Sequence, residues 1–454
     1  MSKRLLTVLG GNPSLNFTQP TYKGKAVYGV SWDKTSNVTL TRTNASVGMV
    51  ANAGEGASTP TNDFDSAEMF GDLEEITDSL GNVFVKFPLH WIRKTSIDGR
   101  LTKQMSYAPL PGGYRPWCFY DFTNHVWLDY ILVGKYVASE SGGKLESKAG
   151  TFPLINQNIV TFRNYALANN TGGLDGYQQM DMHVYDMLQT WFTVEYATLD
   201  GQSKMQGWTT GRYTATDLAT VTETNTNRII VANATAALYA VGQPIAVGTS
   251  QGGNQVFYGR LITSIDVYDA SNMTINFDGA PVNITAGNYL YNVGWKNGFS
   301  SSIAASSGSL ISNSNGKSPM VYRGVENIWG NVWQFVDGVN INEWRAWVCK
   351  NAAQYASNLF ASPYEQLSFL NANVNNYTKY MGYDPLLPFC EFPVDVSANY
   401  YRDYYYQTSG QRVALVGGPW YDGSAAGPWY WYLSSSSSNA YVNVGGRLVK
   451  KGTI

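Results

Sequence analysis

The sequence predicts an α+β fold that has a β-rich N-terminal region and a small all-β domain inserted into a mixed domain. Helical periodicity is clear in only two segments, whereas β-rich runs bounded by Gly, Pro and Asn recur along the chain. An aromatic-rich texture is interrupted between Trp208 and Trp295 by a stretch with hardly any Trp. The length of 454 residues favours two to four domains over a single core.

The first region, residues 1–95, is predicted to consist of short strands. β-rich runs occupy 26–32 and 38–42, and the Gly/Ala/Ser/Thr-rich stretch 52–62 is a loop. Apolar residues alternate along 83–88, which ends in proline as an edge strand does.

The N-terminal segment lacks the pattern of a secretory signal. Its apolar run after Arg4 is broken by Gly10, Gly11 and Pro13, too early for a signal peptide. No apolar stretch approaches the ~20 residues of a transmembrane helix. We therefore expect neither ordinary secretion nor membrane insertion.

The mixed domain is predicted to comprise residues 96–208 and 294–454. Residues 158–167 and 180–196 carry the two helical patterns, and in the second an apolar stripe recurs at three- and four-residue intervals. A Met/aromatic stripe of this kind is typical of a core helix. Residues 127–134 lead into a buried strand.

The inserted domain is predicted to span residues 209–293. Its Thr/Val/Ile-rich runs at 228–231, 243–247, 259–262 and 273–277 are separated by Gly and Asn turns. Short strands at regular spacing are typical of a small barrel or sandwich. A loop of the surrounding domain tolerates such an insertion where its ends lie close together.

Charge and aromatic content narrow the possible functions. Charged residues make up 14% of the chain and the formal net charge is −2, so no basic field attracts nucleic acid. The chain holds 32 Tyr and 14 Trp, more than cores need. Tyr and Trp supply rigid contact area in binding surfaces, although aromatic cross-strand pairs in sheets are an equal alternative for most of them.

Two motifs carry a resemblance to a known fold. Residues 324–335 read GVENIWGNVWQF, and the C-terminal segment has RV at 412–413, GG-x-W at 417–420 and NVGGRL at 443–448. Both motifs resemble signatures of the formylglycine-generating-enzyme branch of the C-type-lectin fold. The resemblance covers roughly residues 80–205 and 295–454 and implies a C-type-lectin-like (formylglycine-generating-enzyme-type) domain.

The segment 417–448 is further similar to the variable region of diversity-generating-retroelement proteins, in which template adenines are rewritten. Its glycines and Trp420 and Val444 are expected to be scaffold, and the intervening residue types are those that an asparagine codon randomised at its adenines reaches. Trp429 and Trp431 could belong either to the scaffold or to the residues that contact the ligand. The resemblance implies ligand contacts from Pro419, Tyr421, Asp422, Ser424, Ala425, Pro428, Tyr430, Tyr432, Ser434, Ser435, Ser436, Asn439, Tyr441 and Asn443. The alternative is a Ser-rich flexible loop with incidental aromatics.

The resemblance implies a phage or prophage receptor-binding protein of the tail tip or fibre. Its expected partners are a bacterial cell-surface receptor, protein or glycan, and other virion tail proteins, with no nucleic acid. The first sixty or so residues are similar to N-terminal segments of tail-fibre-like proteins, which implies that the region 1–95 attaches the chain to the virion or forms the oligomer. A homo-oligomer is expected, with a trimer as in many tail-tip proteins, and release by lysis. The alternative is a structural tail component.

The enzyme branch of the fold is the second alternative. The resemblance implies that its oxidase reaction needs a copper-binding cysteine pair near the C-terminal motif, but residues 411–454 contain no cysteine. Cys118, Cys349 and Cys390 lie upstream without metal-type spacing. We therefore expect no oxidase activity and no enzyme.

No cofactor is expected from the remaining polar residues. The three histidines, His90, His125 and His183, are too scattered for a metal cluster. The enzyme branch would place a structural Ca²⁺ near Asn331, but a turn cap is the favoured interpretation of that residue. A pair of carboxylates that meet only in space, as in a glycan-cleaving enzyme, is invisible in sequence.

Overall fold

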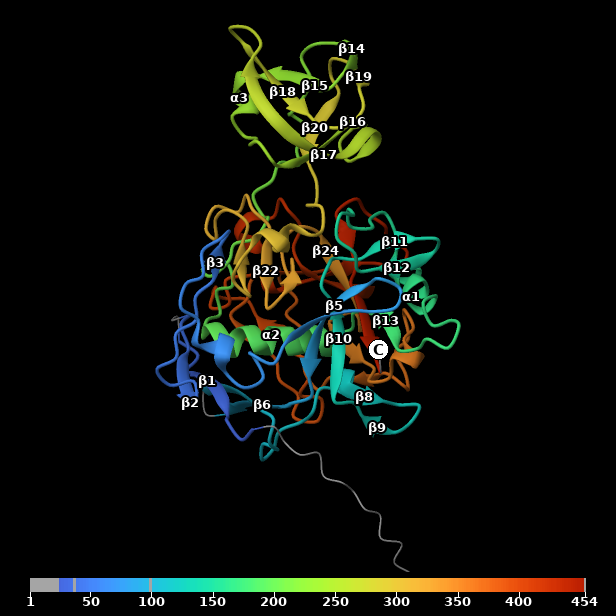
Figure 1. The fold of residues 1–454 in the computed structure, drawn as a ribbon. Coiled ribbons are helices and arrows are strands. Elements are labelled where there is room, and N and C mark those ends of the chain that lie inside the picture. Colours follow the sequence, from blue (N-terminus) through green and yellow to red (C-terminus); the bar gives the residue numbers. More distant parts are fainter. Residues whose placement is uncertain (1–23, 36–37, 98–99, 453–454) are drawn as a thin grey trace, which may run out of the picture.

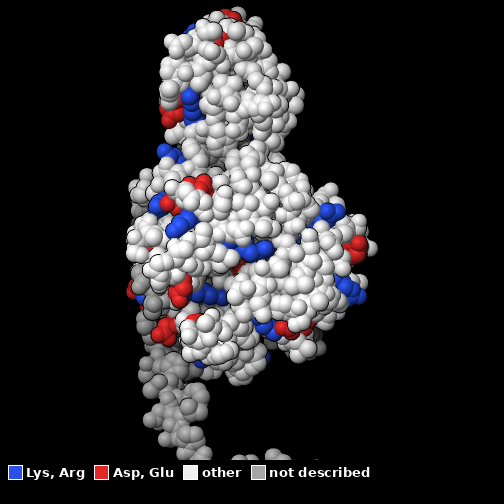
Figure 2. Space-filling model, turned by 90° about the vertical axis from the view of Figure 1, so that its right-hand side faces the viewer, with Lys and Arg blue, Asp and Glu red and all other residues white. Residues whose placement is uncertain are grey.

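The chain folds into a large main body and a smaller inserted lobe. The computed structural model describes residues 24–35, 38–97 and 100–452. Figure 1 shows the lobe, residues 217–292, joined to the main body by two thin chain segments, and Figure 2 shows the same narrowing after a 90° turn. Charged side chains are few and scattered on the face in Figure 2. The described chain is mostly β-sheet with few helices.

The two predicted helices of the main body are confirmed as α1 (Ile159–Leu167) and α2 (Met182–Tyr196). Each begins at a side-chain cap, with Asn158 accepting from the amide of Thr161 and Asp181 from that of Val184. Every residue of α2 is buried, and the helix crosses the middle of the main body in Figure 1. A helix that is covered on all sides is a core element.

Three larger sheets surround α2 in the main body. An eight-stranded sheet carries most of the C-terminal half, a five-stranded sheet has the C-terminal strand β34 beside β10, and a four-stranded sheet has the order β2-β1-β7-β6. The eight-stranded sheet contains β24 (Trp333–Asn342), β25 (Arg345–Val348), β26 (Glu365–Gln366), β27 (Asn376–Tyr377), β30 (Tyr404–Gln407), β31 (Gln411–Gly417), β32 (Gly427–Ser435) and β33 (Val444–Gly445). The five-stranded sheet contains β4 (Glu74–Thr77), β5 (Val83–Pro88), β10 (Tyr130–Gly134), β13 (Tyr177–Gln179) and β34 (Leu448–Lys451). The four-stranded sheet contains β1 (Tyr28–Trp32), β2 (Thr41–Asn44), β6 (Trp91–Ile97) and β7 (Arg100–Ser106).

Short strands and 3₁₀ turns complete the main body. A small sheet joins a strand near the N-terminus to three strands of the 308–326 segment, and three hairpins lie at the periphery. The small sheet contains β3 (Gly54–Glu55), β21 (Gly308–Ser309), β22 (Met320–Tyr322) and β23 (Val325–Glu326). The hairpins are formed by β8 (Tyr120–Asp121) with β9 (Val126–Trp127), β11 (Ser139–Ser141) with β12 (Lys144–Glu146), and β28 (Tyr380–Met381) with β29 (Pro393–Asp395). The 3₁₀ turns are η1 (Asp63–Ser66), η2 (Trp117–Phe119), η3 (Phe299–Ser302), η4 (Ala352–Gln354) and η5 (Gly423–Ala425).

The boundary predicted at residue 95 is wrong. It falls inside β6, and β1 pairs with β7 from Tyr28 opposite Met105 to Trp32 opposite Leu101. β5 is likewise an interior strand, between β4 and β10, and not the edge strand that its closing proline suggested. Residues 28–95 therefore share the sheets and the core of the main body, because strand pairing across the boundary buries their apolar faces together. Residues 1–23 lie outside the described residues.

The inserted lobe has its own core. A five-stranded sheet of order β15-β18-β17-β16-β20 and the pair β14-β19 enclose a cluster that includes Ile229, Ile245, Ile275 and Leu290. The lobe lies within the predicted insertion 209–293. Its elements are β14 (Glu223–Thr226), β15 (Arg228–Ala232), α3 (Asn233–Ala236), β16 (Pro244–Ser250), β17 (Gly253–Val267), β18 (Asn272–Phe277), β19 (Val282–Ile284) and β20 (Tyr289–Asn292).

A buried arginine joins the two sequence motifs. Arg447 is fully buried, and its guanidinium donates to five acceptors on three segments of the main body. Burial lowers the pKa of Arg447 to about 9, so the side chain is charged at neutral pH. Its planar set of donors suits several carbonyls at once. The acceptors are the carbonyls of Gly134, Lys135, Glu326 and Asn327 and Oε1 of Gln334.

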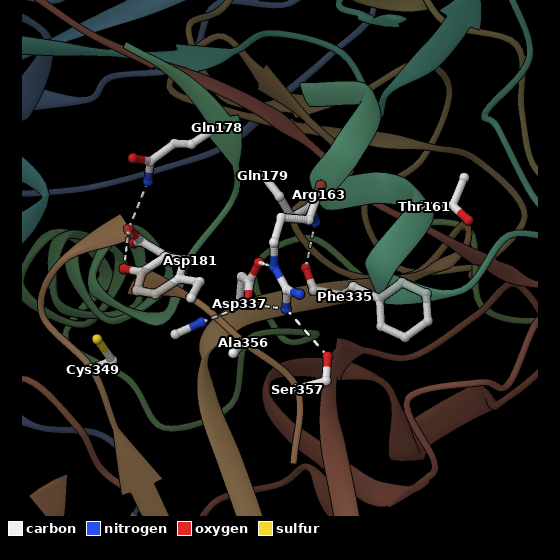
Figure 3. A network of polar contacts seen from close by, with 12 residues as sticks. Thr161, Arg163, Gln178, Gln179, Asp181, Phe335, Asp337, Cys349, Ala356 and Ser357 are labelled. Carbon is white, nitrogen blue, oxygen red and sulfur yellow. Dashed lines mark hydrogen bonds and ion pairs between the residues drawn. The ribbon is translucent and has the colours of Figure 1, made fainter. Parts of the chain in front are cut away.

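A second polar network joins α1 and α2 to β24, as Figure 3 shows. Arg163 of α1 makes a bidentate ion pair with Asp337, at 2.7 and 2.9 Å. Asp181, the cap of α2, accepts from Gln178 at 2.7 Å and from the hydroxyl of Tyr355 at 2.9 Å. Because both carboxylates are almost fully buried and hydrogen-bonded, the network fixes the helices against the large sheet.

We predict that Arg447→Met lowers the free energy of unfolding by roughly 3–5 kcal/mol, because four carbonyls and an amide oxygen lose their donor in the core. Urea denaturation of the purified chain measures this change. Arg345→Met is the matched control, since Arg345 is exposed on β25, and it should stay within about 0.5 kcal/mol of the unchanged chain. Equal stability of the two variants would contradict the role assigned to Arg447.

Candidate ligand-binding site

The largest cluster of predicted contact residues lies around one open pocket of about 620 Å³, here called the tyrosine pocket. Its wall combines the C-terminal segment, strands β24 and β31 of the eight-stranded sheet, and the base of the inserted lobe. It is lined by Asn156, Tyr213, Gly252, Trp333, Leu415, Tyr421, Asp422, Tyr430, Tyr432, Ser435, Ala440, Tyr441, Val442, Asn443 and Val444.

The alternation of β32 divides its four consecutive aromatic residues between two environments. Trp429 and Trp431 point into the main core, where they pack on Phe192 and Tyr185 of α2. Tyr430 and Tyr432 point the other way, toward the tyrosine pocket. Successive side chains of a strand face opposite sides, so the two Trp side chains are scaffold and the two Tyr side chains belong to the pocket wall.

Trp333 is the centre of the pocket floor. Its ring lies 4.5 Å from that of Tyr430 and 5.2 Å from that of Tyr432, measured between centroids. Trp333 also pairs in register with Val444, since β24 and β33 are parallel neighbours. The first motif thus supplies the floor on which the end of the second motif rests.

The inserted lobe closes one side of the pocket. Tyr213, on the segment that leads into the lobe, stacks on Tyr421 with centroids 4.8 Å apart and planes 13° apart. The turn between β16 and β17 reaches the same place, because a Cβ on Gly252 would lie 2.1 Å from the Tyr213 hydroxyl oxygen and 3.3 Å from Val442. The pocket therefore depends on how the lobe docks on the main body.

Asn331 fixes the chain where the lobe is inserted. Its amide donates to the carbonyl of Trp208, its Oδ1 accepts from the amide of Trp295 at 2.6 Å, and its carbonyl accepts from the amide of Trp420. Its φ of 65° is left-handed, as a turn residue requires.

This environment of Asn331 does not fit the structural Ca²⁺ that the resemblance implied. Both of its oxygens already accept backbone hydrogen bonds, whereas Ca²⁺ takes six to eight oxygen ligands. Within the described ranges, no group of three or more His, Cys, Asp or Glu side chains could hold a metal ion.

Asp422 is the charged side chain of the pocket wall. Burial raises its pKa to about 6, and a hydrogen bond with Tyr430 opposes the shift. The tyrosines around it titrate far higher, because burial raises the pKa of Tyr421, Tyr430 and Tyr432 above the ordinary value of 10. Asp422 is thus the group of this wall that changes charge between pH 4 and 8.

Half of the fourteen predicted contact residues meet at this pocket, and the rest do not line it. Tyr421, Asp422, Tyr430, Tyr432, Ser435, Tyr441 and Asn443 line it. Ser424 lines a separate polar groove of about 500 Å³ with Asp200 and Arg402. The residues outside the pocket wall are Pro419, Ser424, Ala425, Pro428, Ser434, Ser436 and Asn439.

Two of the predicted contacts are wrong because the side chains are buried in scaffold. Pro419 is buried beside Trp420. Pro428 is buried against α2, and its carbonyl accepts from Tyr185 and Gln189 at 2.9 and 2.6 Å. Ser435 and Tyr430 are also largely buried, with exposed fractions of 2% and 6%, but both reach the pocket wall. Trp420 and Val444, expected as anchors, are buried as predicted.

Several residues of the pocket wall were not predicted from the sequence. Trp333 lies in the first motif, residues 324–335, and the Trp-rich pattern of that motif could have identified it as a wall residue. No local sequence signal could have identified Asn156, Tyr213 and Gly252, because they reach the pocket only through the docking of distant segments. Ala440 and Val442 lie within the predicted variable region 417–448.

We predict that Asp422→Asn stabilises the chain above pH 6 but not at pH 4. Because the pKa is raised in the folded state, the native chain holds this proton more tightly than the unfolded chain, and the contribution to stability is lost as pH rises from 4 through 6. Unfolding free energies measured from pH 4 to 7.5 should show the gap between the variant and the original widening by about 1–3 kcal/mol. A gap that does not change with pH would contradict the shift.

No protein-family model matches the chain, and no curated protein matches it in sequence at a significant level. No helix in the described part of the chain is long and apolar enough to cross a membrane. What the chain binds is therefore inferred from the geometry and chemistry of the tyrosine pocket.

Proposed function

We propose that the chain is a phage receptor-binding protein that presents a diversified tyrosine pocket on a C-type-lectin-like fold. In this proposal the pocket contacts a bacterial cell-surface receptor. The segment before the main body attaches the chain to other tail proteins of the virion, and a trimeric assembly adds avidity. The observation that carries the proposal is the convergence of seven predicted contact residues on one pocket.

The arrangement of scaffold and wall supports this proposal. Arg447 and the parallel pairing of β33 with β24 hold the C-terminal end of the variable segment in the core, and the buried Trp420 holds its beginning. Gly417 has a φ of 90°, and a Cβ there would lie 3.1 Å from the Trp329 backbone, so this turn needs glycine. Between these fixed points Tyr432 and Tyr441 project from the scaffold with exposed ring surface, where they can differ with little effect on the core, whereas Tyr430 also packs in a core cluster with Trp333.

The wall composition also supports binding. Tyr and Trp rings with Ser and Asn side chains resemble the chemistry of antibody paratopes, in which tyrosine gives large contact area at low entropic cost. Tyr441, 45% exposed, and the half-buried Tyr432 offer ring surface to a partner.

Catalysis by the oxidase branch finds little support in the cysteines. Cys118, Cys349 and Cys390 are all buried, and burial raises the pKa of each thiol. A thiol held protonated is a poor nucleophile and metal ligand. The buried carboxylate of Glu391 is paired with Lys94 and Lys103 at 3.1 and 2.7 Å, an arrangement that suits structure better than acid/base chemistry.

We predict that Tyr432→Ala and Tyr441→Ala together weaken binding of the labelled protein to susceptible bacterial cells at least about tenfold. Flow cytometry on a panel of strains measures this binding, and the melting temperature checks folding. Tyr268→Ala is the matched control, because Tyr268 is a tyrosine 41% exposed on the inserted lobe. Binding that falls with Tyr268→Ala and not with the double variant would contradict the assigned site.

The retroelement part of the proposal predicts where the gene varies. Mismatches between the segment encoding residues 417–448 and a nearby repeat should fall at template adenines, and they should change wall residues such as Tyr432 and Tyr441 while sparing Trp429 and Trp431. Sequencing this locus in related phages or hosts gives the answer. Mismatches spread over all four bases would exclude a retroelement and leave the pocket unaffected.

A further inference from the structure

The tyrosine pocket combines many aromatic rings with a single negative charge. Five tyrosines and Trp333 line it, and Asp422 is the one ionisable carboxylate in the wall. Among the described residues that line the pocket there is no Lys or Arg. The five tyrosines are Tyr213, Tyr421, Tyr430, Tyr432 and Tyr441.

We infer that the tyrosine pocket binds an ammonium group, primary or quaternary, carried by a larger ligand. The inference rests on the proposed function, because it names the chemical group of the receptor that the pocket would take. Faces of Tyr and Trp rings attract cations, and sets of such rings recognise quaternary ammonium groups in aromatic cages. A carboxylate in the same wall adds a direct charge attraction.

Four of the five tyrosine rings are held in place before any ligand arrives, and Tyr441 is the exposed one. Tyr421 is stacked on Tyr213, and Tyr432 is stacked on Tyr406 with planes 10° apart and centroids 5.2 Å apart. Tyr430 is fixed between Trp333 and its hydrogen bond with Asp422. A site whose side chains are already ordered loses less entropy on binding, which favours affinity for a small group.

The same wall disfavours other ligand groups. An anion would approach Asp422 without a positive side chain to balance the repulsion. A purely apolar group would remove water from the carboxylate and leave its hydrogen bond with Tyr430 as the compensation, which is costly for a charged group. A cation satisfies the carboxylate and the ring faces together, so it is the group that suits both features of the wall.

The inference is tested by calorimetric titration of the full chain with choline and with 3,3-dimethyl-1-butanol, its uncharged isostere, at pH 7.5. We expect choline to bind at least roughly tenfold more tightly than the isostere, because only choline carries the charge. Titration with Nα-acetyl-lysine amide shows whether the pocket favours a quaternary or a primary ammonium group. Binding of either cation above the isostere supports the inference, and equal affinities or no saturable binding of both cations would overturn it.

Variants locate the bound cation. Asp422→Asn keeps the shape of the wall and should weaken choline roughly tenfold without changing the isostere. Tyr441→Leu should weaken choline more than Tyr441→Phe, since phenylalanine keeps a ring face. Tyr268→Leu on the inserted lobe should leave choline binding unchanged, and a loss there equal to that of Tyr441→Leu would overturn the assignment.

Failure of the inference and failure of the proposed function give different results. If choline does not bind but Tyr432→Ala with Tyr441→Ala still abolishes cell binding, the ammonium inference fails and the receptor site stands. If choline binds and the same double variant leaves cell binding unchanged, the cation site stands and the receptor function fails.

Discussion

The constraint on which the main body depends is the burial of one guanidinium among backbone carbonyls. Arg447 lies three residues after Val444, where the pocket-lining segment ends, and its acceptors belong to the end of β10 and the next residue, to residues 326–327 and to β24. A charged group that is fully buried needs all of these partners, since an unpaired one costs several kcal/mol. The backbone at Arg447 is therefore held in one place, and the residues between the buried Trp420 and Val444 must bridge two fixed points.

That constraint explains how one short segment contributes both to the core and to the pocket wall. β32 alternates, so Trp429, Trp431 and Leu433 complete the core around α2 while Tyr430 and Tyr432 form the pocket wall. Substitutions at Tyr432 change the wall without touching the core around α2, whereas Tyr430 is also part of the second core cluster with Trp333 and Leu415. The inserted lobe adds a further wall through Tyr213 and Gly252, which couples the shape of the pocket to the docking of a separate core.

Patterns local in the chain were predictable, and contacts made by docking were not. The period of residues 182–196 and the strands of the 209–293 segment could be read because burial imposes a short-range repeat. The N-terminal boundary failed because β1 pairs with β7 and β5 with β10, pairings that no local signal specifies. At the site, the glycines and Tyr432 were identifiable. Burial of Pro428 under α2 and the approach of Gly252 required the three-dimensional structure.

We propose that the partner contacts the tyrosine pocket, and site-specific photo-crosslinking can detect this contact. A benzophenone amino acid replaces Tyr441 at the pocket in one variant and Val267, 77% exposed on the inserted lobe, in another. Each is irradiated with envelope fractions of a susceptible bacterium. We expect a discrete crosslinked envelope component from position 441 and none from position 267. Crosslinks from position 267 alone would contradict it.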